Sequence, residues 1–267
     1  MAVDLLVVGG TGLLGSTIVE LADRRGLNWA ATFCTSARSG ERWHHADLRS
    51  IRPLLDRLQP AAIVNAAYIN AGADLDAITR EAPIELARWT GDTGARLIQL
   101  STDIVFDGEL GRAYTEADPP NPVNDYGRAK AAMEPAVLAA DPAAVVVRTS
   151  LLWGGPGDGG PQVRLVRDPD VRFFTDEYRN PLDVTSLAAA CLELVDRPEI
   201  TGLLHVAGPE RVDRLSFARA LAPLAGVDPD SLQGGTGASM PGRPADVSLD
   251  SSLAESLLTA ELRGLPA

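Results

Sequence analysis

The sequence predicts an α/β fold in which a doubly wound parallel sheet carries a small carboxyl-terminal lobe. Three features of the chain point to this fold. Short apolar runs alternate with helix-like segments up to about residue 150, a glycine-rich turn joins the first run to the first helical segment, and the alternation loosens beyond residue 150. Strands that alternate with helices form a parallel sheet, and right-handed crossovers place the helices on both of its faces.

The expected strands of the first part are short and almost continuously apolar, as in parallel sheets that are covered on both faces. They cover residues 3–8, 28–33, 62–64, 96–100 and 143–148. Helices are expected at 14–24, 51–58, 75–92 and 125–140. Gly26 and Pro60 follow the first two helices and end them. Pro83 lies inside the third helix, where a proline removes a helical hydrogen bond, so a break or kink is expected there.

The second part of the chain is expected to form a smaller lobe over the carboxyl ends of the strands, where ligands bind in such sheets. Its expected strands cover residues 171–174 and 203–206, and its expected helices cover 184–195 and 215–225. Residues 154–160 and 234–242 are rich in glycine and are expected to be loops.

Charge and composition exclude several classes of partner. The net charge is −12, and an acidic protein repels nucleic acid and anionic membrane surfaces. No apolar run is long enough to span a bilayer, and the first residues lack the basic segment of a signal peptide. Cys34 and Cys191 form no CxxC pair, which is typical of free thiols in a cytosolic protein. We therefore expect a cytoplasmic protein that acts on a small molecule.

A phosphate-binding turn is the strongest local signal. Residues 9–15 read GGTGLLG, follow a strand and open a helix. The first glycine allows a tight turn, the third lets the backbone approach a pyrophosphate, and the last lets the helix pack closely on the strand. The helix N-terminus adds free N–H groups and a partial positive charge. The turn predicts a dinucleotide site whose contacts are Gly9, Thr11, Gly12, Leu13, Leu14 and Gly15.

The residues after the second strand favour NADP over NAD. An acidic residue usually binds the ribose 2′-hydroxyl of NAD here, and residues 34–38 (CTSAR) contain none. Ser36 and Arg38 could instead bind a 2′-phosphate, so we expect NADPH as the preferred cofactor, with NAD as the alternative. Two further pairs are placed beside the cofactor by their position in the fold, namely Asp47 with Leu48 and Ala66 with Ala67.

We accordingly divide the chain into two parts. Residues 1–150 are expected to form an NAD(P)-binding Rossmann domain. Residues 151–267 are expected to form mainly a substrate-binding lobe, with the chain returning to the Rossmann core.

A catalytic group is predicted at the start of the helix over 125–140. Tyr126 and Lys130 stand four residues apart, so they lie on one helical face. A nearby ammonium lowers the pKa of a phenol, and Tyr126 could then exchange a proton with a ketone oxygen while Lys130 also holds the nicotinamide ribose. Ser101 and Thr102 end the fourth strand, and Thr102 could donate a hydrogen bond to the same oxygen. This order and spacing suit a ketoreductase site.

These motifs together resemble the extended short-chain dehydrogenase/reductases, and within them the dTDP-4-dehydrorhamnose reductase branch. The resemblance covers nearly the whole chain. Besides the glycine turn it rests on VNAAY at 64–68, STDIVFDG at 101–108, PVNDYGRAK at 122–130, RTS at 148–150, NP at 180–181, and RP at 243–244 followed by LD at 249–250. The stretches that begin at Ser101 and Arg243 are quite specific to this branch.

The resemblance implies NAD(P)H-dependent reduction of a sugar 4-ketone, with Thr102, Tyr126 and Lys130 as the catalytic triad. Cofactor contacts are then also expected at Tyr68, Ser101, Tyr126, Lys130 and Ser150. Substrate contacts are expected at Asp103, Ile104, Asn124, Leu151, Trp153 and Arg179. Homodimers are common among such proteins, so a homodimer is an expectation as well.

Several departures from the family pattern concern the substrate. Ile104 stands where the branch usually has Tyr and Leu151 where it usually has Trp, which removes aromatic surface from the sugar pocket. The segment 153–176 is shorter than its counterpart, and the pattern D-Q-x-G-x-P-T reads DEYRNPL at 176–182. This change introduces Arg179, either as an anion contact or as a surface residue. A sugar-like ketone of secondary metabolism therefore fits as well as dTDP-4-dehydrorhamnose.

Three other functions share part of these motifs. A sugar-nucleotide 4,6-dehydratase needs a carboxylic acid where this chain has Ile104, which cannot act as an acid. An epimerase uses the same turn and triad, so it is one alternative. The regulatory β subunit of methionine adenosyltransferase resembles the same branch and works by binding a partner, so a non-catalytic NADP-binding subunit is the other. The intact triad favours catalysis.

Two further features are interpreted as structural. His44 and His45 lack other ligand candidates at metal spacing, so a solvent-facing loop is expected there and no metal site. Trp29, Trp43 and Trp89 are expected to be packing residues.

Overall fold

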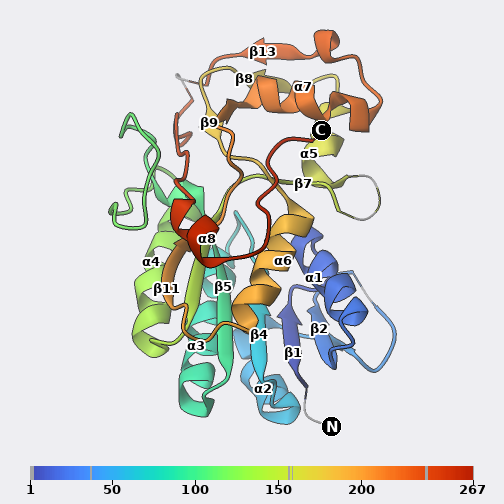
Figure 1. The fold of residues 1–267 in the computed structure, drawn as a ribbon, viewed down its shortest axis with the longest axis vertical. Helices are drawn as coiled ribbons and strands as arrows, with labels where there is room; N and C mark the ends of the chain where they lie inside the picture. Colours follow the sequence, from blue (N-terminus) through green and yellow to red (C-terminus); the bar gives the residue numbers. More distant parts are fainter. Residues whose placement is uncertain (1–2, 37, 156, 158, 238–239, 267) are drawn as a thin grey trace.

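The main sheet of the computed structural model is parallel and carries helices on both faces (Figure 1). The structure describes residues 3–36, 38–155, 157, 159–237 and 240–266. Within these residues the sheet has seven strands in the order β11-β6-β5-β4-β1-β2-β3. The strands are β1 (Leu5–Val8), β2 (Trp29–Phe33), β3 (Trp43–His45), β4 (Ala62–Asn65), β5 (Arg96–Thr102), β6 (Val145–Thr149) and β11 (Gly202–His205). The predicted α/β fold class is confirmed.

The strand order reverses beside β1. The chain runs from β1 outward to β2 and β3 and then returns to β4 on the other side of β1. Because β1 pairs with both β2 and β4, the loops that leave β1 and β4 turn to opposite sides of the sheet. Sheets of this class bind ligands at such a switch point.

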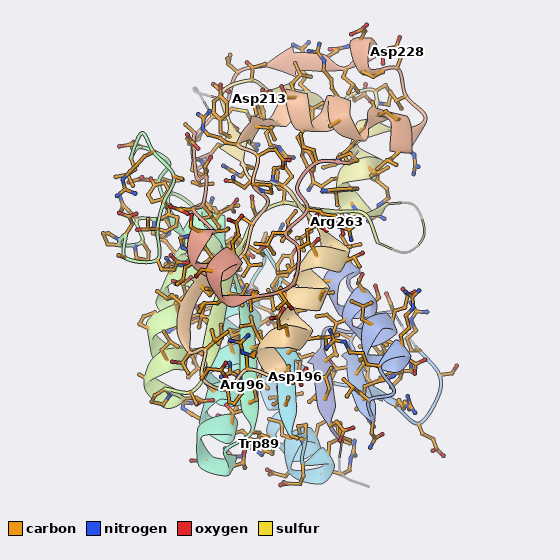
Figure 2. All side chains as sticks on the ribbon, in the orientation of Figure 1. Trp89, Arg96, Asp196, Asp213, Asp228 and Arg263 are labelled. Atoms are coloured by element: carbon orange, nitrogen blue, oxygen red, sulfur yellow. The ribbon has the colours of Figure 1, made fainter. Side chains whose placement is uncertain are left out.

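Each face of the sheet has its own apolar core, because successive side chains of a strand point to opposite faces. Leu5 and Val7 of β1 pack with α1 and α6, whereas Leu6 and Val8 pack with α2, α3 and α4. The helices are α1 (Leu13–Arg24), α2 (Arg52–Leu58), α3 (Ala82–Thr93), α4 (Asp125–Ala140) and α6 (Val184–Val195). Trp89 of α3 is buried in the second core (Figure 2).

A small lobe stands over the carboxyl ends of the strands (Figure 1). Its core holds Val163, Phe173 and Phe217. Its elements are α5 (Gly160–Val166), β8 (Arg172–Phe174), β9 (Tyr178–Arg179), β12 (Val212–Asp213), α7 (Arg214–Ala225) and β13 (Gln233–Gly235). The strands pair as β8 with β13 and β9 with β12, while β7 (Leu152–Trp153) pairs with β10 (Leu182–Asp183). A last helix, α8 (Ser252–Leu257), follows the lobe.

The second part of the chain returns to the sheet and then crosses between sheet and lobe. α6 covers the sheet beside α1, and β11 pairs with β6. Near the C-terminus, the N–H of Asp183 donates to the Arg263 carbonyl at 2.8 Å, and the N–H of Arg263 donates to the Ser186 hydroxyl at 3.2 Å. Figure 2 shows Arg263 between sheet and lobe. The division of the chain at residue 150 stays a prediction.

The break expected at Pro83 is a change of helix type shortly before the proline. A π-helical turn, Ala77–Glu81, precedes α3, and Pro83 stands in the first turn of α3. A proline is tolerated there because the first N–H groups of a helix have no partner inside it. The helix therefore changes its hydrogen-bonding pattern before the proline and continues beyond it.

Local reading of the sequence was wrong at three short elements. His44 and His45 belong to the edge strand β3, where Thr32 pairs with His44, and not to a loop. α5 begins at Gly160, at the end of the expected glycine loop, and β13 overlaps the start of the second expected loop. Residues 156, 158, 238 and 239 of those loops lie outside the described residues.

In the described part of the chain, no helix combines the length and apolar character needed to cross a membrane.

Candidate active site

The glycine turn between β1 and α1 leaves a helix N-terminus open. Gly9 adopts a φ of +83°, and its N–H donates to the Thr32 hydroxyl at 3.0 Å. A Cβ on Gly15 would lie 2.1 Å from the Gly9 carbonyl oxygen, so this close packing requires glycine. Gly12 is the N-cap of α1, and no side chain caps this described helix. The N–H groups of its first turn are therefore available to an anion.

Two adjoining pockets lie at the switch point and share Gly12, Ala66, Ala67 and Tyr68. Gly9, Thr11 and Leu48 line the first pocket beside β2. The second pocket lies between the turn, β5 and α4, and besides the shared residues eight further predicted residues line it: Leu13, Leu14, Gly15, Ser101, Thr102, Tyr126, Lys130 and Ser150. The fold thus brings most of the predicted cofactor residues and all three predicted catalytic residues to one cleft.

Tyr126 faces this cleft beside Tyr68. The centroids of the two rings are 5.7 Å apart and their planes meet at 47°. Burial raises the pKa of the Tyr126 phenol, Tyr68 and Asp103 raise it further, and the Thr102 hydroxyl lowers it. The lowered pKa expected from Lys130 is therefore wrong for this structure. A phenol with a raised pKa is protonated at neutral pH, which is the form that can donate a proton.

Lys130 is fully enclosed beneath the cleft. Its Nζ donates a hydrogen bond to the Leu100 carbonyl at 2.8 Å and lies 5.9 Å from the centroid of the Tyr68 ring. Burial lowers the pKa of Lys130 to about 8, and the Glu134 carboxylate one turn along α4 partly offsets this effect. Lys130 is therefore charged at neutral pH and close to losing its proton.

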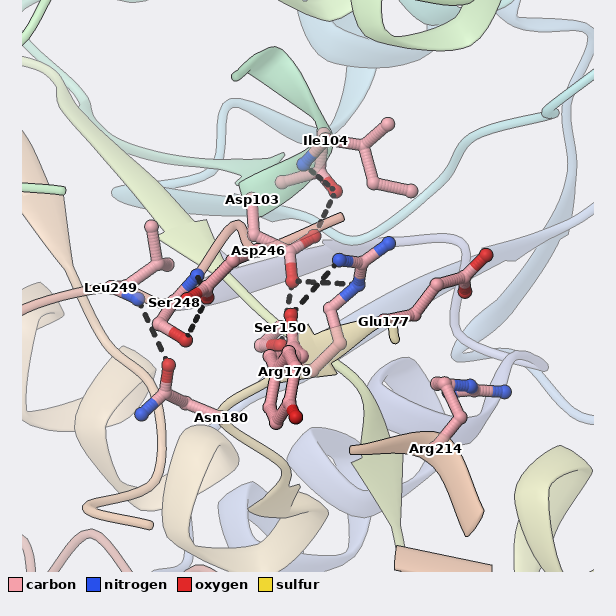
Figure 3. A network of polar contacts seen from close by, with 12 residues as sticks. Asp103, Ile104, Ser150, Glu177, Arg179, Asn180, Arg214, Asp246, Ser248 and Leu249 are labelled. Carbon is pink, nitrogen blue, oxygen red and sulfur yellow. Dashed lines mark hydrogen bonds and ion pairs between the residues drawn. The ribbon is translucent and has the colours of Figure 1, made fainter. Parts of the chain in front are cut away.

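A polar network around Asp103 and Arg179 runs from the end of β5 into the lobe (Figure 3). Thr102 begins this network. Its hydroxyl donates to Asp103 Oδ1 at 3.1 Å and accepts from the Ile104 N–H at 3.3 Å. Asp103 Oδ2 accepts from the Ser150 hydroxyl at 2.6 Å and lies 3.6 Å from Arg179 Nε. Asp103 and Arg179 are 3% and 5% exposed, so this ion pair is buried.

The remaining predicted residues lie outside the lining of the two pockets. Ser36 is exposed, and the exposed Arg38 lies 5.7 Å from the centroid of the Trp43 ring. Asp47 caps a short helical turn by accepting from the Arg49 N–H at 3.0 Å. A second set comprises Ile104, Asn124, Leu151 and Trp153. Of these, Asn124 caps α4, and Leu151 and Trp153 pack against the lobe core.

Three polar residues of the site were not predicted from the sequence. Thr149 lines the pocket, and its buried hydroxyl has no hydrogen-bond partner among the described residues. Glu134 accepts from the Ser101 hydroxyl at 2.6 Å and from two nitrogens of Arg148 at 3.0 and 2.6 Å. The stretch RTS at 148–150 marked Arg148 and Thr149 as part of a motif. Nothing at Glu134 marks it, because a polar residue within a helix usually faces solvent.

Fold and site together define an NAD(P)-dependent oxidoreductase of the short-chain dehydrogenase/reductase type. The chain belongs to the family described as RmlD substrate binding domain, whose model matches residues 3–265.

No group of three or more His, Cys, Asp or Glu in the described residues could hold a metal ion.

Similar proteins include both reductases and a subunit of methionine adenosyltransferase 2. The chain is 34% identical to a dTDP-4-dehydrorhamnose reductase of Mycobacterium tuberculosis, over 93% of this chain and 84% of that protein. It is 28% identical to the methionine adenosyltransferase 2 subunit beta of Bos taurus, over 95% and 82%. The crystal structure of dTDP-4-dehydrorhamnose reductase from Bacillus anthracis, in complex with NADP, has a TM-score of 0.84 at 20% identity and covers 99% of this chain and 96% of that one.

Proposed function

We propose that this protein uses NADPH to reduce the ketone of a 4-keto sugar, or of a sugar-like intermediate, that is linked to a nucleotide. The observation that carries the proposal is the convergence of Thr102, Tyr126 and Lys130 on one pocket beside the glycine turn. The reductase from Mycobacterium tuberculosis, whose name gives a 4-keto sugar as its substrate, supports the choice of substrate class.

The residues of the cleft fit a nicotinamide dinucleotide. The uncapped start of α1 suits a pyrophosphate, and the close packing at Gly15 keeps that helix end next to the turn. The unpartnered hydroxyl of Thr149 suits a polar group such as a carboxamide, since buried hydroxyls normally have a partner. Once bound, the reduced nicotinamide supplies the hydride for the ketone carbon.

Tyr126 is the proton donor in this proposal. Its phenolic O–H bond breaks as an O–H bond forms on the ketone oxygen, and the raised pKa of Tyr126 keeps the phenol protonated beforehand. Lys130 lines the same pocket, and in this proposal its charge offsets part of the cost of the buried phenolate that results. Thr102 exchanges its hydrogen bond to Asp103 for one to the ketone oxygen.

Cofactor titration followed by a substrate screen tests this function. Reduced-nicotinamide fluorescence of the purified protein is expected to show binding of NADPH in preference to NADH. Nucleotide-linked 4-keto sugars are then offered with NADPH, and loss of absorbance at the nicotinamide band measures turnover. Tight binding with reduction of at least one such ketone supports the proposal, whereas failure to bind either cofactor contradicts it.

A partner-binding subunit is the second candidate, because the methionine adenosyltransferase subunits are also similar to this chain. It predicts cofactor binding with no turnover and a partner that co-purifies at a fixed ratio. An epimerase predicts interconversion of the ketone's stereoisomers without net consumption of NADPH. The homodimer and the cytoplasmic location stay predictions, and light scattering of the purified protein tests the first.

A further inference from the structure

Arg179 connects the lobe to the catalytic edge of the sheet. It lies on β9, which is held by antiparallel pairing with β12, and its Nη1 donates to the Tyr178 carbonyl at 3.0 Å. From there its Nε reaches Asp103 Oδ2 at 3.6 Å (Figure 3). The next residue, Asn180, accepts from the Leu249 N–H at 2.9 Å, which fixes this part of the lobe.

The carboxylate of Asp103 has a different partner on each oxygen. Oδ2 is held by Ser150 and Arg179, and this leaves Oδ1 to face the Thr102 hydroxyl. The orientation of the proposed ketone-binding hydroxyl therefore depends on how Oδ2 is held. Asp103 also acts through its charge, since it raises the pKa of Tyr126.

We propose that Arg179 is a positioning residue of the active site. It neutralises and orients the buried Asp103 carboxylate. In this way it fixes the orientation of the Thr102 hydroxyl and influences how readily Tyr126 gives up its proton. The inference rests on the proposed reductase function. Arg179 touches neither of the two pockets, so it acts through Asp103.

The charges around Asp103 give this inference a pH dependence. Burial raises the pKa of Asp103, and Arg179 is the largest of the groups that lower it. The groups that face the carboxylate are Thr102 on β5, Tyr126 on α4, Ser150 after β6, Arg179 on β9 and Arg214 on α7; Tyr68 also faces Tyr126. Without Arg179 the pKa of Asp103 rises further. At a pH above this pKa, the Asp103 carboxylate carries a charge that Arg179 no longer balances, and this charge makes Tyr126 a weaker proton donor. At a pH below it, Asp103 is neutral and has no such effect.

Arg179→Met is therefore expected to lose activity in a pH-dependent way. We expect the fractional loss of kcat to grow as the pH rises from 5 to 9 and to reach about tenfold, which corresponds to about one pKa unit at Tyr126, with KM for NADPH unchanged. Arg179→Lys keeps the charge and is expected to restore most of the activity. The double variant Arg179→Met with Asp103→Asn is expected to lose the same fraction of the wild-type kcat at every pH. Arg211→Met, which changes a half-exposed arginine paired with Asp246 on the lobe, is the matched control.

A purely structural role for Arg179 predicts the same fractional loss of kcat at every pH, and that result would overturn the inference. A second measurement needs no substrate. The urea midpoint of Arg179→Met is expected to fall more at pH 8 than at pH 5, because the ionised Asp103 then lacks a partner of opposite charge at that site, and Asp103→Asn is expected to reverse the loss. Equal losses at both pH values overturn the inference even if no ketone is reduced. If the wild type reduces no ketone but these midpoints behave as expected, the reductase proposal fails and the Arg179–Asp103 coupling stands.

Discussion

The Nζ of Lys130 donates a hydrogen bond to the carbonyl of Leu100 at 2.8 Å, in a position where the lysine side chain is only 2% exposed. Burial of a charged group costs free energy that one neutral acceptor does not restore. This cost lowers the pKa of Lys130 to about 8. The protein therefore holds a buried ammonium in the pocket that its proposed proton donor also lines.

Replacing Lys130 with methionine is expected to separate stability from activity. The pKa of Lys130 in the folded state, about 8, lies below the ordinary value of 10.5, so wild-type stability rises between these two pH values. At pH 7 the variant lacks the buried charge, and we expect its free energy of unfolding to be higher by on the order of 1–3 kcal/mol. This gain should shrink toward pH 10.5, while turnover is lost at every pH. Urea denaturation at pH 7 and pH 10 measures the gain, and a variant less stable at pH 7 would contradict the argument.

Tyr126→Phe is expected to lower kcat by about 100-fold or more, because the change removes the phenolic proton that is transferred to the ketone oxygen. The Kd for NADPH should change less than threefold, since the ring is kept. Steady-state kinetics and fluorescence titration measure the two quantities. Tyr178→Phe is the matched control, because its ring packs against Arg211 on the lobe. Full activity in the Tyr126 variant would refute the assignment of the proton donor.

Thr149→Val tests whether the unpartnered hydroxyl serves the cofactor. In the free protein the change removes a buried polar atom that has no partner in the described residues, so stability should stay equal or rise by about 1 kcal/mol. NADPH affinity should fall about tenfold, since one buried hydrogen bond to the cofactor is lost. Thr149→Ser keeps the hydroxyl and should retain the affinity. Unchanged NADPH binding in the valine variant would show that the hydroxyl plays no part in it.

Arg38→Ala is expected to weaken NADPH binding about tenfold and NADH binding much less, because only NADPH carries a 2′-phosphate for the guanidinium. Arg38 is exposed beside Trp43, so the change should leave the fold intact. Arg42→Ala serves as the control, because Arg42 already pairs with Asp23 at 3.1 Å. Titration of both variants with both cofactors gives the comparison. Equal weakening of the two cofactors would rule out the 2′-phosphate contact.

The helices and central strands could be predicted because their signals are local. The helix over 125–140 and the helix over 184–195 have the predicted bounds, and in the structure Asn124 and Asp183 are their N-caps. Short elements were missed because they form by pairing with segments elsewhere in the chain and carry no local pattern of their own. β3 contains only Trp43, His44 and His45, too few residues to show a period, and it forms because β2 offers an edge to pair with.

The sequence by itself determined the fold class, the glycine turn and the presence of Tyr126, Lys130 and Thr102, because periodicity, glycine spacing and the i, i+4 relation act over a few residues. Only the tertiary structure decided that Arg179 reaches Asp103, that Glu134 joins Ser101 to Arg148, and that the pKa of Tyr126 is raised. These outcomes depend on burial and on contacts between segments far apart in the chain. Such contacts exist only once β5, α4 and the lobe are packed together.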